Sequence, residues 1–115
     1  MKLKLAVLVQ SSEPLSKLMN NPMPSATAFK CAKVLKAVSS ELEAYEEARK
    51  KAIETHGKDG EISEKSKNWD KFVKELNELL ATDVKLDVEK VKSENLSKVE
   101  VSPTDLIALD WLIEE

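Results

Sequence analysis

Hydrophobic residues recur at steps of three and four through the middle of the chain, from Ser25 to His56. No Gly or Pro interrupts this stretch, and the good helix formers Ala, Leu, Lys and Glu dominate it. The pattern predicts one long helix over 25–56. Its heptad-like apolar seam is formed by Ala28, Cys31, Leu35, Val38, Leu42, Tyr45, Arg49 and Ala52. Such a helix is roughly 45–50 Å long, whereas a compact domain of this size is about 30 Å across.

A second amphipathic pattern follows, with apolar residues at the spacing of one helix face: Trp69, Phe72, Val73, Leu76, Leu79 and Leu80. It predicts a helix over 68–81 that packs antiparallel on the long helix. Gly57 is expected to end the long helix. The dipeptide Asp59-Gly60 is typical of a tight hairpin turn, so a small exposed hairpin or a plain loop joins the two helices.

Alternating apolar and polar positions predict strands in three places. The first is near the N-terminus, where Leu3, Leu5, Val7 and Val9 recur at every second position. The other two are 84–88 and 99–101. A short helix carrying Leu15, Leu18 and Met19 is expected between the breaks at Pro14 and at 20–24.

The C-terminal pattern predicts a helix over 103–114. Ser102 fits the N-cap, Pro103 the first helical position and Asp105 the third. The following residues are apolar on nearly all sides, so this helix is expected either to be deeply buried or to face another chain. The predicted fold class is α+β in a single domain, 1–115: a small antiparallel sheet that includes the N-terminal strand, a helical hairpin and a short apolar C-terminal helix.

Composition removes several function classes. The chain has 115 residues, 42% of them hydrophobic, which suits one globular domain. Its net charge of −3 creates no general attraction for nucleic acids or anionic membranes. Neither a signal peptide nor an apolar stretch of about 20 residues is recognisable, so we expect a cytoplasmic protein with no membrane contact.

The chain also has few residues that could form a catalytic site. One Cys and one His are present, and on a continuous helix Cys31 and His56 would be about 38 Å apart, too far for a Cys–His pair. His56 with Asp59 and Glu61 is a weak metal-ligand set. Two glycines are too few for a phosphate-binding loop. We therefore expect no catalytic site, no cofactor and no metal.

Lysines along the long helix are mixed with glutamates and carry no interleaved aromatics, so we interpret them as solvated helix surface rather than as a nucleic-acid site. The helix over 68–81 would be about 20 Å long and would cover less than half of the long seam. The sheet, the terminal helix or a second copy of the chain must cover the rest. We therefore expect a dimer or higher oligomer, with the candidate interface residues Leu35, Val38, Leu42, Tyr45, Arg49, Trp111 and Ile113.

Several segments together resemble a family of small bacteriophage proteins of Gram-positive hosts that has no assigned function. They are Phe29-Lys30 leading into the Lys/Glu-rich helix, the run from Glu46 to Lys51, the run from Phe72 to Leu80, and the ending from Asp105 to Ile113. The resemblance implies a phage-encoded, intracellular, non-enzymatic accessory protein, located in the host cytoplasm. It transfers no catalytic residues.

Two functional hypotheses follow. The first is a self-associating protein–protein interaction module that serves as an assembly or virion-accessory factor with another phage protein as partner. The alternative is a host-directed inhibitor that binds and occludes a bacterial defence or regulatory protein. Neither requires chemistry at a cleft with convergent titratable groups, which an enzyme would need.

Overall fold

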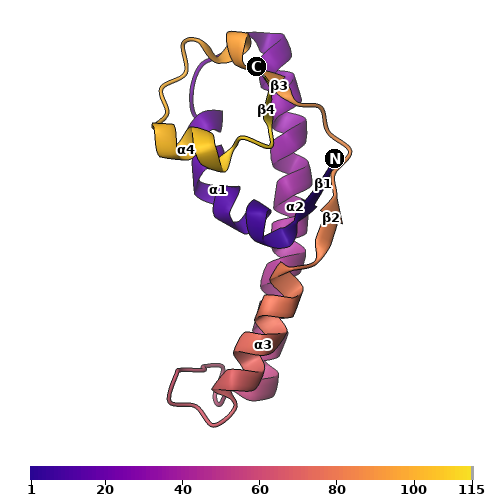
Figure 1. The fold of residues 1–115 in the computed structure, drawn as a ribbon, viewed down its shortest axis with the longest axis vertical. Helices are drawn as coiled ribbons and strands as arrows, with labels where there is room; N and C mark the ends of the chain where they lie inside the picture. Colours follow the sequence, from indigo (N-terminus) through magenta and orange to yellow (C-terminus); the bar gives the residue numbers. More distant parts are fainter. Residues whose placement is uncertain (115) are drawn as a thin grey trace.

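The computed structural model describes residues 1–114 and has an elongated shape of 51 × 26 × 20 Å. Its radius of gyration is 16.8 Å, against about 13 Å for a compact domain of this length. The cause is the continuous 32-residue helix α2 (Ser25–His56), which runs the length of the molecule (Figure 1). The predicted long helix is therefore confirmed with its predicted boundaries.

The chain is α+β, with nine elements in the described residues. In chain order these are β1 (Lys2–Lys4), α1 (Leu5–Met19), α2, α3 (Trp69–Leu80), β2 (Asp83–Lys85), β3 (Val91–Lys92), the 3-10 helix η1 (Ser93–Leu96), α4 (Pro103–Ala108) and β4 (Ile113–Glu114). α3 lies antiparallel along the C-terminal half of α2, so the predicted helical hairpin is present (Figure 1). α1 and β3 pack on the N-terminal half of α2.

The predicted strand over residues 3–9 is wrong beyond Lys4, because α1 begins at Leu5. The reason is a second periodicity in the same residues. Leu5, Leu8, Ser11, Leu15 and Leu18 recur at steps of three and four, and all five are buried. The helix also continues through Pro14, which was expected to break it. A proline inside a helix costs about 3 kcal/mol, and the burial of Leu15 and Leu18 beyond it offsets that cost.

The sheet is smaller than the alternation suggested. β1 pairs antiparallel with β2 in the register Leu3 to Val84, which confirms the predicted antiparallel sheet with the N-terminal strand. The expected strand over 99–101 is wrong, since these residues pack on the core as irregular chain. A parallel pair forms instead between β3 and β4, with Val91 opposite Ile113.

The predicted C-terminal helix is real but shorter than expected. Ser102 caps it, and its hydroxyl oxygen accepts the amide N–H of Asp105 at 3.1 Å. The helix ends at Ala108 rather than near residue 114. The chain then turns and enters β4, because Leu109 and Leu112 are completely buried in the core and Ile113 pairs with β3. The apolar residues from Leu106 to Ile113 are thus divided between α4, the turn that follows it and β4.

Candidate interaction surfaces

The predicted seam of α2 divides into a buried line and an exposed line. Val38 and Tyr45 are buried in the core of this chain. Leu35 lies on the exposed side, with 38% of its surface accessible, and Leu42 and Arg49 are partly buried. The buried face is shifted by one position toward Thr27 and Val34, because α1, α3 and β3 approach α2 from that side. Only the buried line of the seam is therefore covered within one chain, whereas Leu35 remains exposed.

The two C-terminal candidates have partners inside the chain. Trp111 is partly buried, and its indole N–H donates to the hydroxyl oxygen of Ser11 on α1 at 2.9 Å. Ile113 is partly buried in β4, opposite Val91. Both residues therefore attach the C-terminal segment to the body of the protein. The exposed apolar side chains near the C-terminus are instead Leu106 and Ile107.

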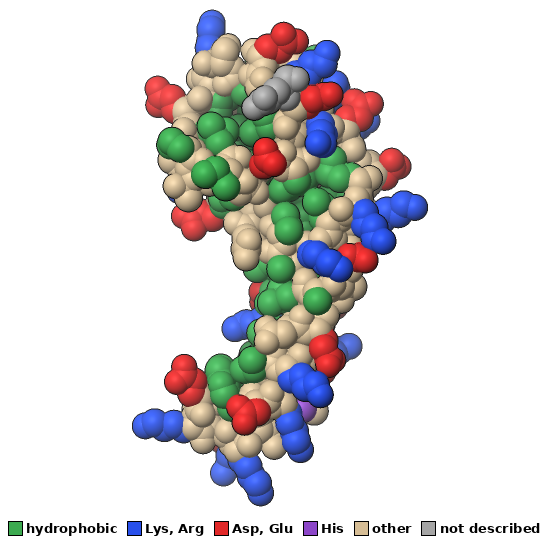
Figure 2. Space-filling model, in the orientation of Figure 1, with side chains coloured by type: hydrophobic (Ala, Val, Ile, Leu, Met, Phe, Trp, Pro, Cys, Tyr) green, Lys and Arg blue, Asp and Glu red, His purple; other side chains and the backbone are tan. Residues whose placement is uncertain are grey.

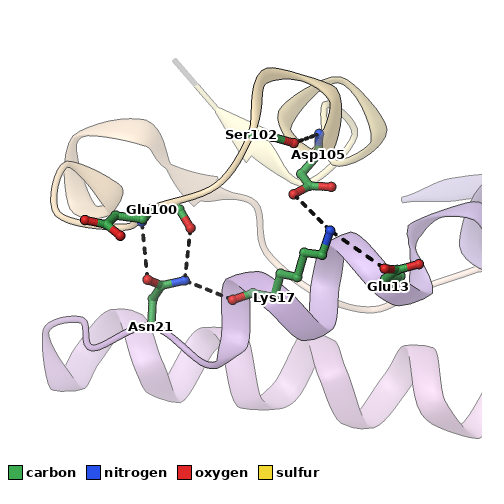
Figure 3. A network of polar contacts seen from close by, with 6 residues as sticks. All are labelled: Glu13, Lys17, Asn21, Glu100, Ser102 and Asp105. Atoms are coloured by element: carbon green, nitrogen blue, oxygen red, sulfur yellow. Dashed lines mark hydrogen bonds and ion pairs between the residues drawn. The ribbon is translucent and has the colours of Figure 1, made fainter.

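A polar network holds the segment that precedes α4 against α1 (Figure 3). The side chain of Asn21 accepts the backbone N–H of Glu100 at 3.3 Å and donates to the carbonyl of Lys17 at 2.9 Å. The Lys17 ammonium lies 3.8 Å from a carboxylate oxygen of Asp105 in α4 and 3.7 Å from Glu13. Together with the Ser102 cap, these contacts determine the position and orientation of α4.

The outer side of α4 exposes the neighbouring apolar residues Leu106 and Ile107. Their accessible fractions are 43% and 78%, the latter being the largest among the large hydrophobic side chains that are exposed in residues 1–114. Asp110 follows one helical turn after Ile107 and is exposed. From Val99 to the end, the sequence has five Asp and Glu residues and no Lys or Arg. We call the surface formed by Leu106, Ile107 and Asp110 the α4 face; it is apolar with an acidic border.

A cleft of about 530 Å³ opens at the far end of the helical hairpin. It lies between the last turns of α2, the first turn of α3 and the loop over 57–68. Its apolar wall consists of Ile53, Ile62, Trp69 and Phe72, and the Trp69 and Phe72 rings are 5.6 Å apart. Arg49 and Lys58 supply two cations to the lining, against one carboxylate, Glu61, and the Arg49 guanidinium also lies 3.7 Å from Glu46 outside the lining. We call it the tip cleft. A site with an apolar wall and a cationic rim suits an apolar side chain that has a carboxylate beside it.

The loop that closes the tip cleft is built by local geometry. Asp59 and Gly60 both have positive φ, 55° and 77°, as a two-residue hairpin turn requires. Lys58 and Glu61 exchange backbone hydrogen bonds of 2.8 and 3.1 Å across this turn. At Gly57 a Cβ atom would lie 2.3 Å from the Glu61 carbonyl oxygen, so only glycine lets the loop approach α2 this closely. The hairpin turn predicted from Asp59-Gly60 is thus confirmed.

Charge is unevenly distributed between the two ends of the molecule. Between Arg49 and Lys74 the sequence has eight Lys and Arg residues against five Asp and Glu residues, whereas the rest of the chain has ten against sixteen. Figure 2 shows the blue side chains gathered around the narrow lower end, where the hairpin tip lies. The acidic net charge of the chain therefore conceals a basic tip and an acidic remainder.

Cys31 and His56 are far apart, as the continuous helix requires. They lie 25 positions apart on α2, about 38 Å along its axis. Cys31 is buried, and burial raises the pKa of its thiol. His56 ends α2, and its Nε2 lies 2.5 Å from a carboxylate oxygen of Glu75, a contact that joins α2 to α3. Cys31 is thus part of the hydrophobic core, and His56 is part of the contact between α2 and α3.

Metal sites and membrane-spanning helices are both absent from residues 1–114. No three His, Cys, Asp or Glu side chains within them gather closely enough to hold a metal ion. None of the helices there has the long, nearly uncharged apolar stretch that crossing a membrane requires. The chain was also compared with protein-family models, curated proteins and solved structures, and no match was found in any of the three.

None of the residues of the α4 face or of the apolar wall of the tip cleft was among the predicted interface residues. Arg49, which was predicted, lines the cleft as a cation. A signal for the α4 face was present in the sequence. On a helix in which Leu109 and Leu112 face the core, Ile107, two positions before Leu109, lies on the opposite side, and Leu106 lies at the edge of the buried side. The tip cleft had no comparable signal, since the loop over 57–68 supplies Lys58 and Ile62 from outside any helical pattern.

Proposed function

We propose that this chain is a non-enzymatic protein–protein interaction module that associates with copies of itself. The observation that carries the proposal is the α4 face, where Leu106 and Ile107 are exposed side by side on a helix of fixed position. Adjacent apolar side chains on a soluble surface, bordered by polar groups, are typical of docking surfaces. The buried thiol of Cys31 and its separation from His56 support the non-enzymatic part of the proposal.

The fixed position of α4 also supports docking. The Ser102 cap, the ion pair between Lys17 and Asp105, and the hydrogen bond from Trp111 to Ser11 all restrain the segment. A surface that is already ordered loses little conformational entropy when a partner binds. The free energy of burying Leu106 and Ile107 is therefore not reduced by a large cost of ordering the segment.

The biological role that we propose is that of an assembly or virion-accessory factor in the cytoplasm of a bacterial host. The resemblance of the helical segments to small bacteriophage proteins supports this role, and another phage protein is the expected additional partner. The alternative, a host-directed inhibitor, differs in where its partner comes from.

Sedimentation velocity of the full chain tests self-association. Measured from about 1 to about 100 micromolar, the mean mass should rise above that of the 12.9 kDa monomer. A constant monomer mass over this range contradicts the proposal.

Affinity capture with tagged protein distinguishes an assembly factor from a host-directed inhibitor. An assembly factor retains a stoichiometric partner only from infected cells, whereas an inhibitor retains one from uninfected cells.

A further inference from the structure

The two surfaces described above are complementary in chemistry. The α4 face presents Ile107 and Leu106 with the carboxylate of Asp110 one helical turn away. The tip cleft presents an apolar wall with Arg49 and Lys58 in its lining. One surface has the apolar projection and the negative charge, and the other has the apolar hollow and the excess of positive charge.

These surfaces cannot meet within one molecule. α4 belongs to the broad upper body, whereas the loop over 57–68 closes the narrow lower end (Figure 1). The helix α2 separates the two ends, and it is continuous over 32 residues, about 48 Å. Any contact between the α4 face and the tip cleft must therefore join different copies of the chain.

We propose that the α4 face of one copy docks into the tip cleft of the next copy, head to tail. The inference rests on the self-association proposed above and specifies its geometry. Ile107 enters the apolar wall formed by Ile53, Ile62, Trp69 and Phe72. The Asp110 carboxylate pairs with the cations of Arg49 and Lys58. Desolvation of apolar groups provides the affinity, and the charges determine the orientation.

Charge favours a second copy as the occupant of the tip cleft. The C-terminal segment that carries Ile107 has carboxylates and no cations, and the residues from Arg49 to Lys74 have an excess of cations. Two tips would repel each other, and so would two α4 faces. A symmetric dimer that uses either surface twice is therefore disfavoured, whereas the contact between unlike ends is favoured.

The arrangement has a structural consequence. A head-to-tail contact uses different surfaces on the two partners, so each copy keeps one free α4 face and one free tip cleft. Association then continues into open chains, or into rings if the rotation between copies closes. The expected mass distribution of the wild-type protein is therefore a concentration-dependent series rather than a single dimer.

Two charge-changing variants test the inference. Ile107→Glu alters the α4 face at the most exposed of its apolar residues, so the fold should be unaffected. Arg49→Glu combined with Lys58→Glu reverses both cations of the tip cleft. Each should weaken self-association by about tenfold or more, the loss expected for a side chain central to a contact.

Matched controls separate these effects from nonspecific ones. Lys36→Glu with Lys90→Glu makes the same change in net charge on exposed positions that lie outside the basic stretch from Arg49 to Lys74 and do not line the cleft. Phe29→Ser removes another exposed apolar side chain, whose ring lies 4.7 Å from the Lys33 ammonium. Both control proteins should associate as the wild type does. Circular dichroism of every variant verifies the fold.

Mixing the two variants provides the decisive measurement. Each alone should be monomeric at a concentration where the wild type associates. In a 1:1 mixture, the intact α4 face of one variant meets the intact tip cleft of the other, so a dimer forms and does not extend. A mixture that stays monomeric, or a tip variant that associates like the wild type, overturns the head-to-tail inference while leaving self-association standing. A monomeric wild type overturns both.

Discussion

Replacing Ser11 with alanine tests whether one buried hydroxyl attaches the C-terminal segment to the body. Ser11 is completely buried in α1. Its Oγ lies 2.6 Å from the carbonyl oxygen of Val7 and 3.2 Å from that of Ala108, and it accepts the Trp111 indole N–H at 2.9 Å. A hydroxyl has one hydrogen, so it donates to one carbonyl at a time, and the shorter distance favours Val7.

The expected loss of stability in Ser11→Ala follows from these contacts. The alanine variant loses two neutral hydrogen bonds, each worth about 1 kcal/mol net, and leaves the Trp111 N–H without its acceptor. Because Trp111 is only partly buried, water can partly replace the lost partner. We therefore expect Ser11→Ala to lower the free energy of unfolding by about 1–3 kcal/mol.

Urea unfolding followed by far-ultraviolet circular dichroism, at about 1 micromolar to limit self-association, measures the loss. Ser12→Ala is the matched control, because Ser12 is the exposed neighbour on the same helix. Its effect should stay within about 0.5 kcal/mol. A double-mutant cycle with Trp111→Phe should give a coupling of about 1 kcal/mol. Equal losses for Ser11→Ala and Ser12→Ala, or strictly additive effects in the cycle, would refute the reasoning.

Three further predictions concern other parts of the molecule. Gly57→Ala should destabilise the protein by about 1–3 kcal/mol in the same assay, because the new Cβ would meet the Glu61 carbonyl oxygen at 2.3 Å; a neutral effect would contradict the described loop. Cys31 should react with a thiol reagent at neutral pH far more slowly in native protein than in urea, since burial raises its pKa; equal rates would show the thiol to be accessible. The hydrogen bond and charge of Lys4 lower the pKa of Asp83 below 3.8, so this pairing stabilises the fold at neutral pH and is lost as the pH falls through that lowered pKa. A carboxyl titration by NMR should show the Asp83 pKa rising in Lys4→Ala; an unchanged pKa would remove the pairing as its cause.

Local patterns in the sequence were sufficient for several elements. The long run without Gly or Pro predicted α2, and the apolar spacing from Trp69 to Leu80 predicted α3. The Ser102 cap and the Asp59-Gly60 turn were also correctly placed. In each case the determining interaction lies within a few residues along the chain, which is why sequence alone could identify it.

The N-terminal segment shows where a local pattern is ambiguous. Leu5, Val7 and Val9 alternate as in a strand, whereas Leu5 and Leu8 belong to a helical series that continues to Leu18. The choice depends on which face can be buried. α2 and α4 both pack on α1, and the buried Ser11 accepts the indole N–H of Trp111.

The sequence by itself determined the α+β class, the long helix, the hairpin and the absence of clustered glycines, cysteines and histidines. Only the tertiary structure decided which side of the α2 seam is buried, that 91–92 pairs with 113–114, and that Ile107 and the tip cleft face outward at different ends. The physical reason is the distance along the chain over which each interaction acts. Helix propensity, caps and turns depend on neighbours in the chain, whereas burial, strand pairing and exposed clefts depend on segments that only the folded chain brings together.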